Sequence, residues 1–490
     1  MSEPASYTWP LHESFLNRNA ELERLEDWWQ SRERMPLNLY GRRRVGKSWL
    51  FRRFAHGKPA VLLVAHRVSA GAQLTTFAER LEPLLGFRPD LPDVPALFRV
   101  LFRASRQHKI LAVIDEFPWL LPGTESGTEA LLSAIQAVLE EERDTSRLKL
   151  ILCGSQVGQM ESLMSERNPL HGRLVPVQVR PLPYPQARPF LTTLSPLEAF
   201  ERYAITGGMP RYLAELGSGT TRSIVSRRVL DRDGPLWDEA RTVLDQELRE
   251  SRVYFAIAQQ LAGGDKELNA ITQATRLSGP VASKYLHTLE QLKIVRRRAP
   301  VGASADSRSG RWRLEDPFFR FWFRFVFPYQ DELESGLRPL DLFDGAVAPA
   351  LPDHVAPVFE SWCRDWTRSQ HGRVAHRVGA WWGPALHGLR KAGERFTEEI
   401  DIVGLGPGRE HVTVAGEAKW TTKQMGLDVL HDLQQYKLPA LRQSGMRISP
   451  DIKIVLFSKS GYSRSLRAAA DADPAVTLLD IADLLNIDAV

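Results

Sequence analysis

The first third of the chain alternates between short, largely apolar runs and longer segments whose apolar residues recur at helical spacing. The short runs have the length and continuity of strands buried inside a parallel sheet. They cover residues 37–40, 60–64, 110–114 and 148–153. The longer segments predict helices, among them 77–85, 95–108 and 128–142. Strands that alternate with helices predict an α/β domain built on a doubly wound parallel sheet.

Three further patterns follow along the chain. Residues 197–216 predict a pair of helices with a fixed bend at Gly207, Gly208 and Pro210, because glycine and proline interrupt a helix. Residues 252–313 predict three helices and a strand pair, which is the element order of a winged helix. Residues 316–329 are densely aromatic and predict a packed linker helix, with a platform that stacks nucleobases as the alternative.

The predicted winged helix has a polar third helix and a basic strand pair. Ser283, Lys284 and His287 are expected to face outward from the helix at 281–292. The basic positions in and around the strand pair are Arg296, Arg297, Arg298, Arg308, Arg311 and Arg313. In a DNA complex the third helix would enter the major groove and the strand pair would meet phosphates. The alternative is a lid or an oligomer contact.

The last segment of the chain predicts a second α/β unit. Its expected elements are a helix at 355–366, strands at 398–404 and 411–420 joined by a Gly-Pro-Gly turn, a helix at 424–442 and a strand at 452–457. Together, the patterns along the chain predict a sheet domain at each end and helices between them.

Composition and charge fit a multidomain globular protein. The 490 residues suggest about three domains. The net charge of +5 is compatible with a nucleic-acid partner. The two cysteines, Cys153 and Cys363, cannot form a disulfide framework, and this favours a reducing, cytoplasmic location. The sequence shows neither a signal-peptide pattern nor an apolar run of membrane-spanning length, so no membrane partner is expected.

A phosphate-binding loop follows the first predicted strand. Residues 41–48 read Gly-x4-Gly-Lys-Ser between a strand and a helix, as a P-loop requires. The backbone N–H groups of such a loop point at an anion, the lysine reaches the β- and γ-phosphates, and the serine hydroxyl holds Mg²⁺. The expected nucleotide-binding residues are Gly41, Arg44, Val45, Gly46, Lys47, Ser48 and Trp49.

The strand at 110–114 runs into two carboxylates, Asp115 and Glu116. After a P-loop this is the Walker B pattern. Asp115 would join Ser48 in coordinating Mg²⁺, and Glu116 would orient or deprotonate the attacking water. The sequence therefore predicts an ATP site in which Lys47 and Glu116 are catalytic.

Two weaker candidates follow the next strand. Ser155 and Gln156 lie at its carboxyl end, where ligands bind in open parallel sheets. One of them could sense the γ-phosphate. The alternative is that they only cap the turn that follows. Among Arg167, Arg173 and Arg180, Arg173 is the preferred candidate for an arginine finger, acting in its own chain or in a neighbouring copy. The second arrangement would require a homo-oligomer.

The segment before the P-loop predicts a helix that Asn17 or Asn19 caps and that carries apolar residues at Leu22, Leu25 and Trp29. It packs on the sheet, and Arg18 is a candidate for the wall of the base pocket. The chain resembles the archaeal-type ATPases of the extended AAA+/STAND group. The segments that carry the resemblance are Asn17-Arg18 with Glu21-Leu22, the P-loop, the Walker B strand, residues 153–155 and residues 208–210. This resemblance implies that Pro210 approaches the adenine.

Two carboxylates and a lysine can meet in the last domain. Glu417 and Lys419 share one face of their strand, and Asp401 converges on them if the two strands pair as a hairpin. Such a group can hold Mg²⁺ beside a cation. The alternative is an ordinary salt bridge of Lys419 with Asp401 or Glu417.

This arrangement resembles the PD-(D/E)XK nuclease fold, to which the last domain of archaeal-type ATPases is similar. The resemblance implies that Asp401 and Glu417 bind metal, that Lys419 is catalytic and that Glu360 is the carboxylate of the first helix. The proline that usually precedes the aspartate is absent, because Ile400 stands there.

These patterns predict four domains: an ATPase core at 1–185, a helical lid at 186–248, a winged helix with the aromatic linker at 249–330, and a restriction-endonuclease-like α/β domain at 331–490. The expected cofactors are ATP and Mg²⁺, and DNA is the expected partner. The predicted function is ATP hydrolysis that controls DNA binding and a metal-dependent nuclease domain. The alternative is a nucleotide-dependent switch or DNA-binding adaptor whose last domain does not cut.

Overall fold

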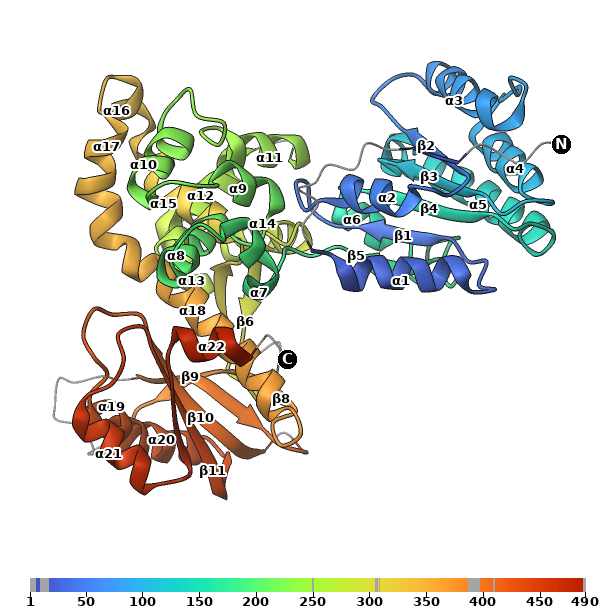
Figure 1. The fold of residues 1–490 in the computed structure, drawn as a ribbon. Coiled ribbons are helices and arrows are strands. Elements are labelled where there is room, and N and C mark those ends of the chain that lie inside the picture. Colours follow the sequence, from blue (N-terminus) through green and yellow to red (C-terminus); the bar gives the residue numbers. More distant parts are fainter. Residues whose placement is uncertain are drawn as a thin grey trace. The chain divides into compact units, whose positions relative to one another are not determined.

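The computed structural model describes residues 6–8, 17–248, 251–304, 307, 309–386, 397–408 and 410–487. The chain forms two compact units (Figure 1). The first contains Met1–Leu182 and Gly208–Arg211, and the second contains Pro183–Gly207 and Tyr212–Val490. In the described ranges, every helix is too short or too polar to span a bilayer.

The first unit is built on a sheet of five strands in the order β2-β3-β4-β1-β5. Every neighbouring pair is parallel, as the sequence pattern predicts. The strands are β1 (Leu37–Tyr40), β2 (Ala60–Val64), β3 (Leu111–Asp115), β4 (Lys149–Gly154) and β5 (Val175–Gln178). Because β4 lies between β1 and β3, the residues that follow these three strands meet at one edge of the sheet.

Helices accompany this sheet, and several of them contribute residues to its apolar core. They are α1 (Asn19–Gln30), α2 (Lys47–Ala55), α3 (Ala70–Leu85), α4 (Val94–Ala104), α5 (Glu125–Glu142) and α6 (Val157–Ser162). The predicted cap of the first helix is wrong. Arg18 is the residue at the N-cap, its backbone is left-handed with φ 75°, and its side chain makes no capping hydrogen bond.

The second unit begins with helices: α7 (Tyr184–Ala187), α8 (Pro196–Thr206), α9 (Pro210–Glu215), α10 (Thr221–Val225), α11 (Glu239–Glu247), α12 (Ser251–Ala262), α13 (Leu268–Thr275) and α14 (Gly279–Gln291). An antiparallel pair follows, β6 (Val295–Arg298) and β7 (Arg311–Leu314). The three helices and two strands predicted between 252 and 313 are therefore present, in that order.

The aromatic segment forms α15 (Pro317–Phe325), which Asp316 caps by accepting hydrogen bonds from two backbone N–H groups. Its aromatic side chains are buried, and this favours the packed-linker interpretation over a stacking platform. The chain continues through α16 (Gln330–Glu334) and α17 (Pro339–Leu342) into α18 (Ala348–His371), which is longer than the helix predicted there.

A second sheet of five strands closes the chain, in the order β12-β11-β10-β9-β8. The strands are β8 (Arg377–Pro384), β9 (Thr397–Leu405), β10 (His411–Lys419), β11 (Arg447–Ser458) and β12 (Val476–Leu479). Strands β9 and β10 pair antiparallel, which is the hairpin that the sequence analysis required. The remaining helices are α19 (Leu427–Asp432), α20 (Leu438–Gln443), α21 (Arg464–Ala472) and α22 (Ile481–Ile487).

Candidate functional sites

The P-loop connects β1 to α2 and lies close against its neighbours. A Cβ on Gly41 would lie 2.3 Å from the carbonyl oxygen of Val179, so a larger residue cannot fit there. Gly46 has φ 95°, a left-handed conformation that suits glycine. The Lys47 ammonium lies 2.8 Å from the carbonyl oxygen of Gly41 and 3.1 Å from that of Arg42. The Lys47 side chain therefore folds back onto the P-loop backbone.

The two predicted Mg²⁺ ligands of this site lie side by side. The Ser48 hydroxyl oxygen is 3.3 Å from the Oδ2 oxygen of Asp115. Burial raises the pKa of Asp115 above its ordinary value, and it lowers the pKa of Lys47 below its own. Both charged forms are disfavoured by burial, so a ligand that supplies compensating charges would stabilise both.

Glu116 is held by the next strand of the sheet. Its Oε2 oxygen accepts a hydrogen bond of 2.9 Å from the Ser155 hydroxyl and a longer one of 3.4 Å from the Ser155 backbone N–H. The backbone of Glu116 is left-handed with φ 54°, which is uncommon for a residue with a side chain and is often found at functional sites. Ser155 is therefore brought together with the Walker B carboxylate.

Arg18 contacts the P-loop through a main-chain atom. Its Nη2 group donates to the carbonyl oxygen of Val45 at 2.8 Å, and its Nη1 group donates to Glu21 at 2.6 Å. Arg18 and Val45 are both buried. The sequence singled out Arg18, but for a base pocket rather than for this hydrogen bond to the loop.

The bend at residues 207–210 reaches the same loop. A Cβ on Gly46 would lie 3.7 Å from Pro210 Cγ, so the proline ring is close to the P-loop. Gly208 is packed so tightly that its Cβ would lie 1.8 Å from the carbonyl oxygen of Leu182. The predicted proximity of Pro210 to the nucleotide site is consistent with this packing.

Three other candidate residues of this site, Arg44, Trp49 and Arg173, lie in different environments. Arg44 adopts a left-handed backbone in the loop, with φ 68°, and the Trp49 side chain is exposed. Arg173 donates through Nε to Glu140 on α5 at 3.0 Å and through Nη1 to the carbonyl oxygen of His171. A role as an arginine finger would require the pair with Glu140 to open, and it stays a prediction.

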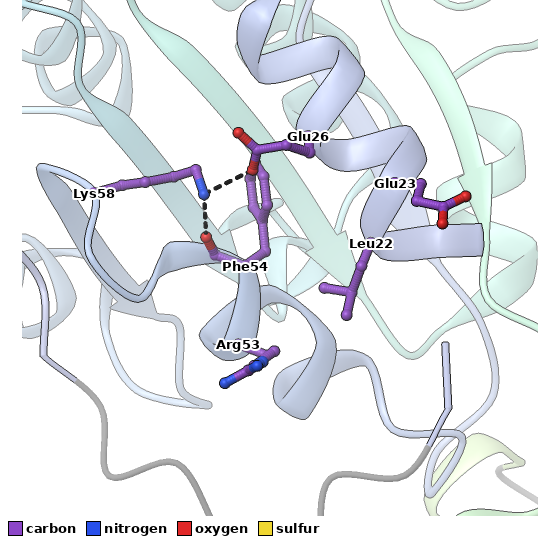
Figure 2. Close-up of a pocket in the computed structure, with 6 residues that line it drawn as sticks. All are labelled: Leu22, Glu23, Glu26, Arg53, Phe54 and Lys58. Carbon is purple, nitrogen blue, oxygen red and sulfur yellow. Dashed lines mark hydrogen bonds and ion pairs between the residues drawn. The ribbon is translucent and has the colours of Figure 1, made fainter. Parts of the chain in front are cut away.

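A surface pocket of about 270 Å³ lies at α1 and α2 (Figure 2). In it, the Lys58 ammonium lies 2.9 Å from Glu26 Oε2 and donates to the carbonyl oxygen of Phe54. The lining residues are Leu22, Glu23, Glu26, Arg53, Phe54 and Lys58. None of them is a predicted site residue.

A second constellation of charged side chains lies on the sheet of the second unit. Lys419 Nζ is 3.1 Å from Asp401 Oδ2 and 2.7 Å from Glu417 Oε2. Asp401 Oδ2 also accepts the backbone N–H of Ala418 at 3.0 Å. The three residues predicted to meet therefore do so, and Lys419 bridges the two carboxylates.

Burial and neighbouring charges shift the pKa values of the residues in this cluster. Burial raises the pKa of Glu417 to about 7, and the Asp401 carboxylate adds to the shift. Burial alone would lower the pKa of Lys419, but the carboxylates of Asp401 and Glu417 raise it above its ordinary value. Burial also raises the pKa of Glu360 on α18, with a contribution from the charge of Asp401. Glu360 lies 3.6 Å from Arg364, whose Nη1 donates to the carbonyl oxygen of Asp401.

Sequence reasoning missed one member of this cluster, Lys437. Its Nζ lies 2.7 Å from Glu417 Oε1, opposite the oxygen that Lys419 binds. The available signal was its spacing. Lys437 stands four residues after Leu433 and four before Leu441, which are both buried, so it lies on the buried side of its helical segment.

The donor set at Glu417 does not fit a divalent cation as it stands, because a lysine occupies each of its two oxygens. Among the residues that the structure describes, no group of three or more His, Cys, Asp or Glu side chains is arranged to hold a metal ion. By contrast, the hydroxyl and carboxylate at Ser48 and Asp115 are oxygen donors of the kind that Mg²⁺ takes beside phosphates.

The arginines of the basic strand pair were expected to meet phosphates, but the structure shows most of them in ion pairs with carboxylates. Asp265 binds two of its arginines, Arg298 at 2.7 Å and Arg313 at 2.5 Å. Arg311 pairs with Glu399 of β9, and Arg296 pairs with Glu315. Carboxylates of the same unit therefore pair with these four arginines, and Asp265 and Glu399 come from outside the strand pair. Arg308 lies outside the described residues.

Ser283, Lys284 and His287 are exposed on α14, as predicted. Their exposed side chains leave this helix face accessible within its unit. The outward face of α14 is therefore an accessible polar surface of this region, and of the strand-pair arginines that form ion pairs, Arg296 is also exposed.

Comparison with known proteins assigns two segments of the chain. Residues 15–216 match a family described as an ATPase domain predominantly from Archaea. Residues 322–429, which include Asp401, Glu417 and Lys419, match a family of archaeal and bacterial proteins of unknown function. The first match spans the P-loop, Asp115, Glu116, Ser155 and Pro210, so the resemblance drawn from the sequence is confirmed for the ATPase. The likeness of the last domain to nucleases is not confirmed.

Two similar proteins come from the same archaeon. An uncharacterized protein of Methanocaldococcus jannaschii is 24% identical over 413 residues, which is 83% of this chain and 87% of that protein. An uncharacterized ATP-binding protein of the same organism is 48% identical over 44 residues, or 9% of this chain and 75% of that protein.

Among solved structures, the Walker-type ATPase PABY2304 of Pyrococcus abyssi matches with a TM-score of 0.47 and 18% identity, over 65% of this chain and 98% of that one. The Aeropyrum pernix ORC2 protein matches with a TM-score of 0.40 and 16% identity, over 67% of this chain and 96% of that one. Both TM-scores lie below 0.5, and nothing about this chain's activity follows from them.

The P-loop, the two carboxylates at the end of β3 and the family match agree with one another. The chain therefore contains an ATPase domain of the family found predominantly in Archaea, at residues 15–216, followed by a domain shared by archaeal and bacterial proteins of unknown function, at residues 322–429.

Proposed function

We propose that the first unit binds ATP at its P-loop and hydrolyses it to ADP and phosphate. The observation that carries this proposal is the meeting of Ser48 with Asp115 and of Ser155 with Glu116 at one edge of the sheet. On binding, Lys47 would exchange two neutral carbonyl acceptors for the β- and γ-phosphates. Ser48 and Asp115 would hold Mg²⁺, which supplies positive charge to the phosphates.

In the hydrolytic step, the oxygen of a water attacks the γ-phosphorus and the bond to the bridging β-phosphate oxygen breaks. Glu116 takes the proton of the water or orients it. Ser155 positions the Glu116 carboxylate through its hydroxyl. Pro210 and Arg18 act on the loop from outside, one by packing beside Gly46 and the other by its hydrogen bond to Val45.

The direct test of this site is binding. Titration with a non-hydrolysable ATP analogue and Mg²⁺ should give saturable binding to the wild type. Lys47→Ala should weaken it at least tenfold, because the lysine meets the charged phosphates. Lys58→Ala, which removes a lysine from the pocket at α1 and α2, is the matched control and should bind as the wild type does. Equal binding by wild type and Lys47→Ala would contradict the proposal.

We further propose that nucleotide binding is communicated to the second unit through α9. Pro210 and Arg211 at its start belong to the first unit, and Tyr212 and the residues after it belong to the second. The Tyr212 ring packs at a tilt against Phe318 of α15 with ring centroids 4.4 Å apart, and its hydroxyl donates to Glu239. The chain thus passes from the first unit into the second within one helix, Pro210–Glu215.

The region from α12 to β7 is proposed to be a winged helix that binds DNA through α14. The exposed Ser283, Lys284 and His287 support this, whereas the arginines paired with carboxylates do not. A gel-shift titration should show affinity that falls steeply with salt. Lys284→Ala should reduce the salt slope by about one, and Arg338→Ala, which removes an exposed cation at the N-cap of α17, should leave it unchanged. No binding at low salt would contradict DNA binding.

A second candidate function is phosphodiester cleavage by the domain at 331–490. The meeting of Asp401, Glu417 and Lys419 favours it, and Glu360 is near enough for the charge of Asp401 to contribute to its raised pKa. Incubation of DNA with the protein and Mg²⁺ or Mn²⁺ should give cleavage that Lys419→Ala abolishes and Lys459→Met preserves. The same lack of cleavage in wild type and Lys419→Ala would favour the alternative, an ATP-dependent switch or adaptor whose last domain does not cut.

A further inference from the structure

Lys437 is a buried lysine that points at the carboxylate cluster of the second unit. It is the last residue of a π-helical segment, Leu433–Lys437, which links α19 to α20. Its side chain is 7% exposed and that of Glu417 only 1%, and their charged atoms lie 2.7 Å apart. Its other acidic neighbour, Asp432, is more distant, at 3.7 Å. Glu417 is therefore its principal partner.

The two oxygens of Glu417 have different lysines as partners. Lys419 donates to Oε2 and Lys437 donates to Oε1, each at 2.7 Å. A divalent cation bound by this carboxylate would stand where one of the two ammonium groups now lies. Lys419 is 35% exposed and also reaches Asp401, whereas Lys437 is enclosed. The buried side of Glu417 is thus closed by a cation that belongs to the chain.

We infer that Lys437 is an internal cation of this site, which neutralises Glu417 and keeps divalent metal ions away from it until the lysine moves. The inference rests on the second candidate function only for the identification of the cluster as a site. It revises the expectation that Asp401 and Glu417 hold a resident Mg²⁺.

The physical reason is the cost of leaving a charge buried and alone. An ionised carboxylate removed from water requires a cation or several hydrogen bonds close to it. Lys437 meets this requirement, so a metal ion gains little by entering and must also displace an ammonium group. If the lysine were replaced by an uncharged side chain of similar length, the Oε1 oxygen of Glu417 would lose its partner while Oε2 kept Lys419. An incoming divalent cation could then take the place of the lost ammonium group.

The experiment is a calorimetric titration of the full-length protein with Mn²⁺, in the absence of nucleotide and DNA. The variants are Lys437→Met, which keeps the length of the side chain without its charge, and Lys437→Met combined with Glu417→Gln. The matched control is Lys459→Met, which removes a lysine paired with Glu201 in the same unit. Thermal unfolding with and without Mn²⁺ checks that each variant is folded and reports binding independently.

We expect Mn²⁺ to bind Lys437→Met at least tenfold more tightly than the wild type and to raise its Tm. The gain should vanish in the double variant and be absent in Lys459→Met. The inference is overturned if the wild type already binds one Mn²⁺ through Glu417 as tightly as Lys437→Met does, or if Lys437→Met gains no Mn²⁺ affinity. Because no DNA is present, this outcome is independent of whether the domain cuts.

Discussion

The hydroxyl of Ser155 donates a hydrogen bond of 2.9 Å to the Oε2 oxygen of Glu116. Ser155 follows β4, which lies between the P-loop strand β1 and the strand β3 that leads to Glu116. The serine therefore stands between the phosphate-binding loop and the proposed catalytic carboxylate. Whether Ser155 also senses the γ-phosphate stays a prediction, and the hydrogen bond to Glu116 is the contact that the structure shows.

Ser155→Ala should lower kcat for ATP hydrolysis about tenfold or more, because a hydrogen bond to a charged group is worth roughly 1.5–3 kcal/mol. KM should change little, since the phosphates are bound mainly by the loop. Steady-state kinetics of the purified variant would measure both constants. Ser155→Thr keeps a hydroxyl and should recover part of the rate. A fall confined to KM would show that Ser155 binds nucleotide without positioning Glu116.

Arg18→Met should raise KM for ATP several-fold, because the Val45 carbonyl loses its partner and the P-loop loses a restraint on its conformation. The kcat value should fall less than KM rises. Glu21→Gln, which retains the arginine, should have a smaller effect. Nucleotide titrations and steady-state rates would separate the two constants, and an unchanged KM in Arg18→Met would contradict the positioning role.

Gly208→Ala should disrupt the first unit, because its Cβ would lie 1.8 Å from the Leu182 carbonyl oxygen. Overpacking of this kind costs about 1–3 kcal/mol or more. We expect a lower Tm and weaker nucleotide binding, as the bend carries Pro210 towards the loop. Gly123→Ala, at a position of the same unit where a Cβ meets nothing within 4 Å, is the control and should change the Tm little. Equal Tm losses in both variants would argue against the steric explanation.

Asp265→Asn should destabilise the second unit by about 3 kcal/mol, because two largely buried arginines lose their shared carboxylate. Burial alone would raise the pKa of Asp265, but Arg313 and Arg298 outweigh burial and hold it below its ordinary value. The carboxylate therefore contributes stability that is complete above about pH 4, the unfolded-state pKa, and is lost as the pH falls through the folded-state pKa.

Chemical denaturation at neutral pH and at acid pH would test this prediction. The difference in unfolding free energy between wild type and Asp265→Asn should be largest near neutrality and should shrink in acid. Asp341→Asn, which removes an exposed carboxylate paired with Arg338, is the control and should change the stability little. A difference that stays constant down to the lowest pH would contradict the assignment.

The sequence predicted the parts of the two sites that are local in the chain. The P-loop and Asp115-Glu116 are short motifs at strand ends, and parallel strands bring their carboxyl ends to one edge. Asp401, Glu417 and Lys419 could be predicted because one hairpin fixes their spacing. The finer division of residues 183–490 into a lid, a winged helix and a final domain stays a prediction.

The rest depended on contacts between residues distant in sequence. Arg18 donates a hydrogen bond to a carbonyl oxygen 27 positions away in the sequence. Every residue has a backbone carbonyl, so the sequence does not indicate which one accepts this bond. Asp265 neutralises arginines that follow it by 33 and 48 residues, so the strand pair looked basic although two of its charges are paired internally. Lys437 lies among the apolar positions of a helical segment, and only its four-residue spacing from Leu433 and Leu441 indicated that it is buried.

The central claim is that ATP is hydrolysed at the P-loop with Glu116 as the base. Its most direct test is the steady-state rate of phosphate release from ATP and Mg²⁺ by the wild type and by Glu116→Gln, with nucleotide binding measured in parallel. We predict turnover by the wild type and a rate lowered at least about a hundredfold in Glu116→Gln, with binding retained. Hydrolysis by Glu116→Gln at the wild-type rate, or no hydrolysis by a wild type that binds ATP, would contradict the account.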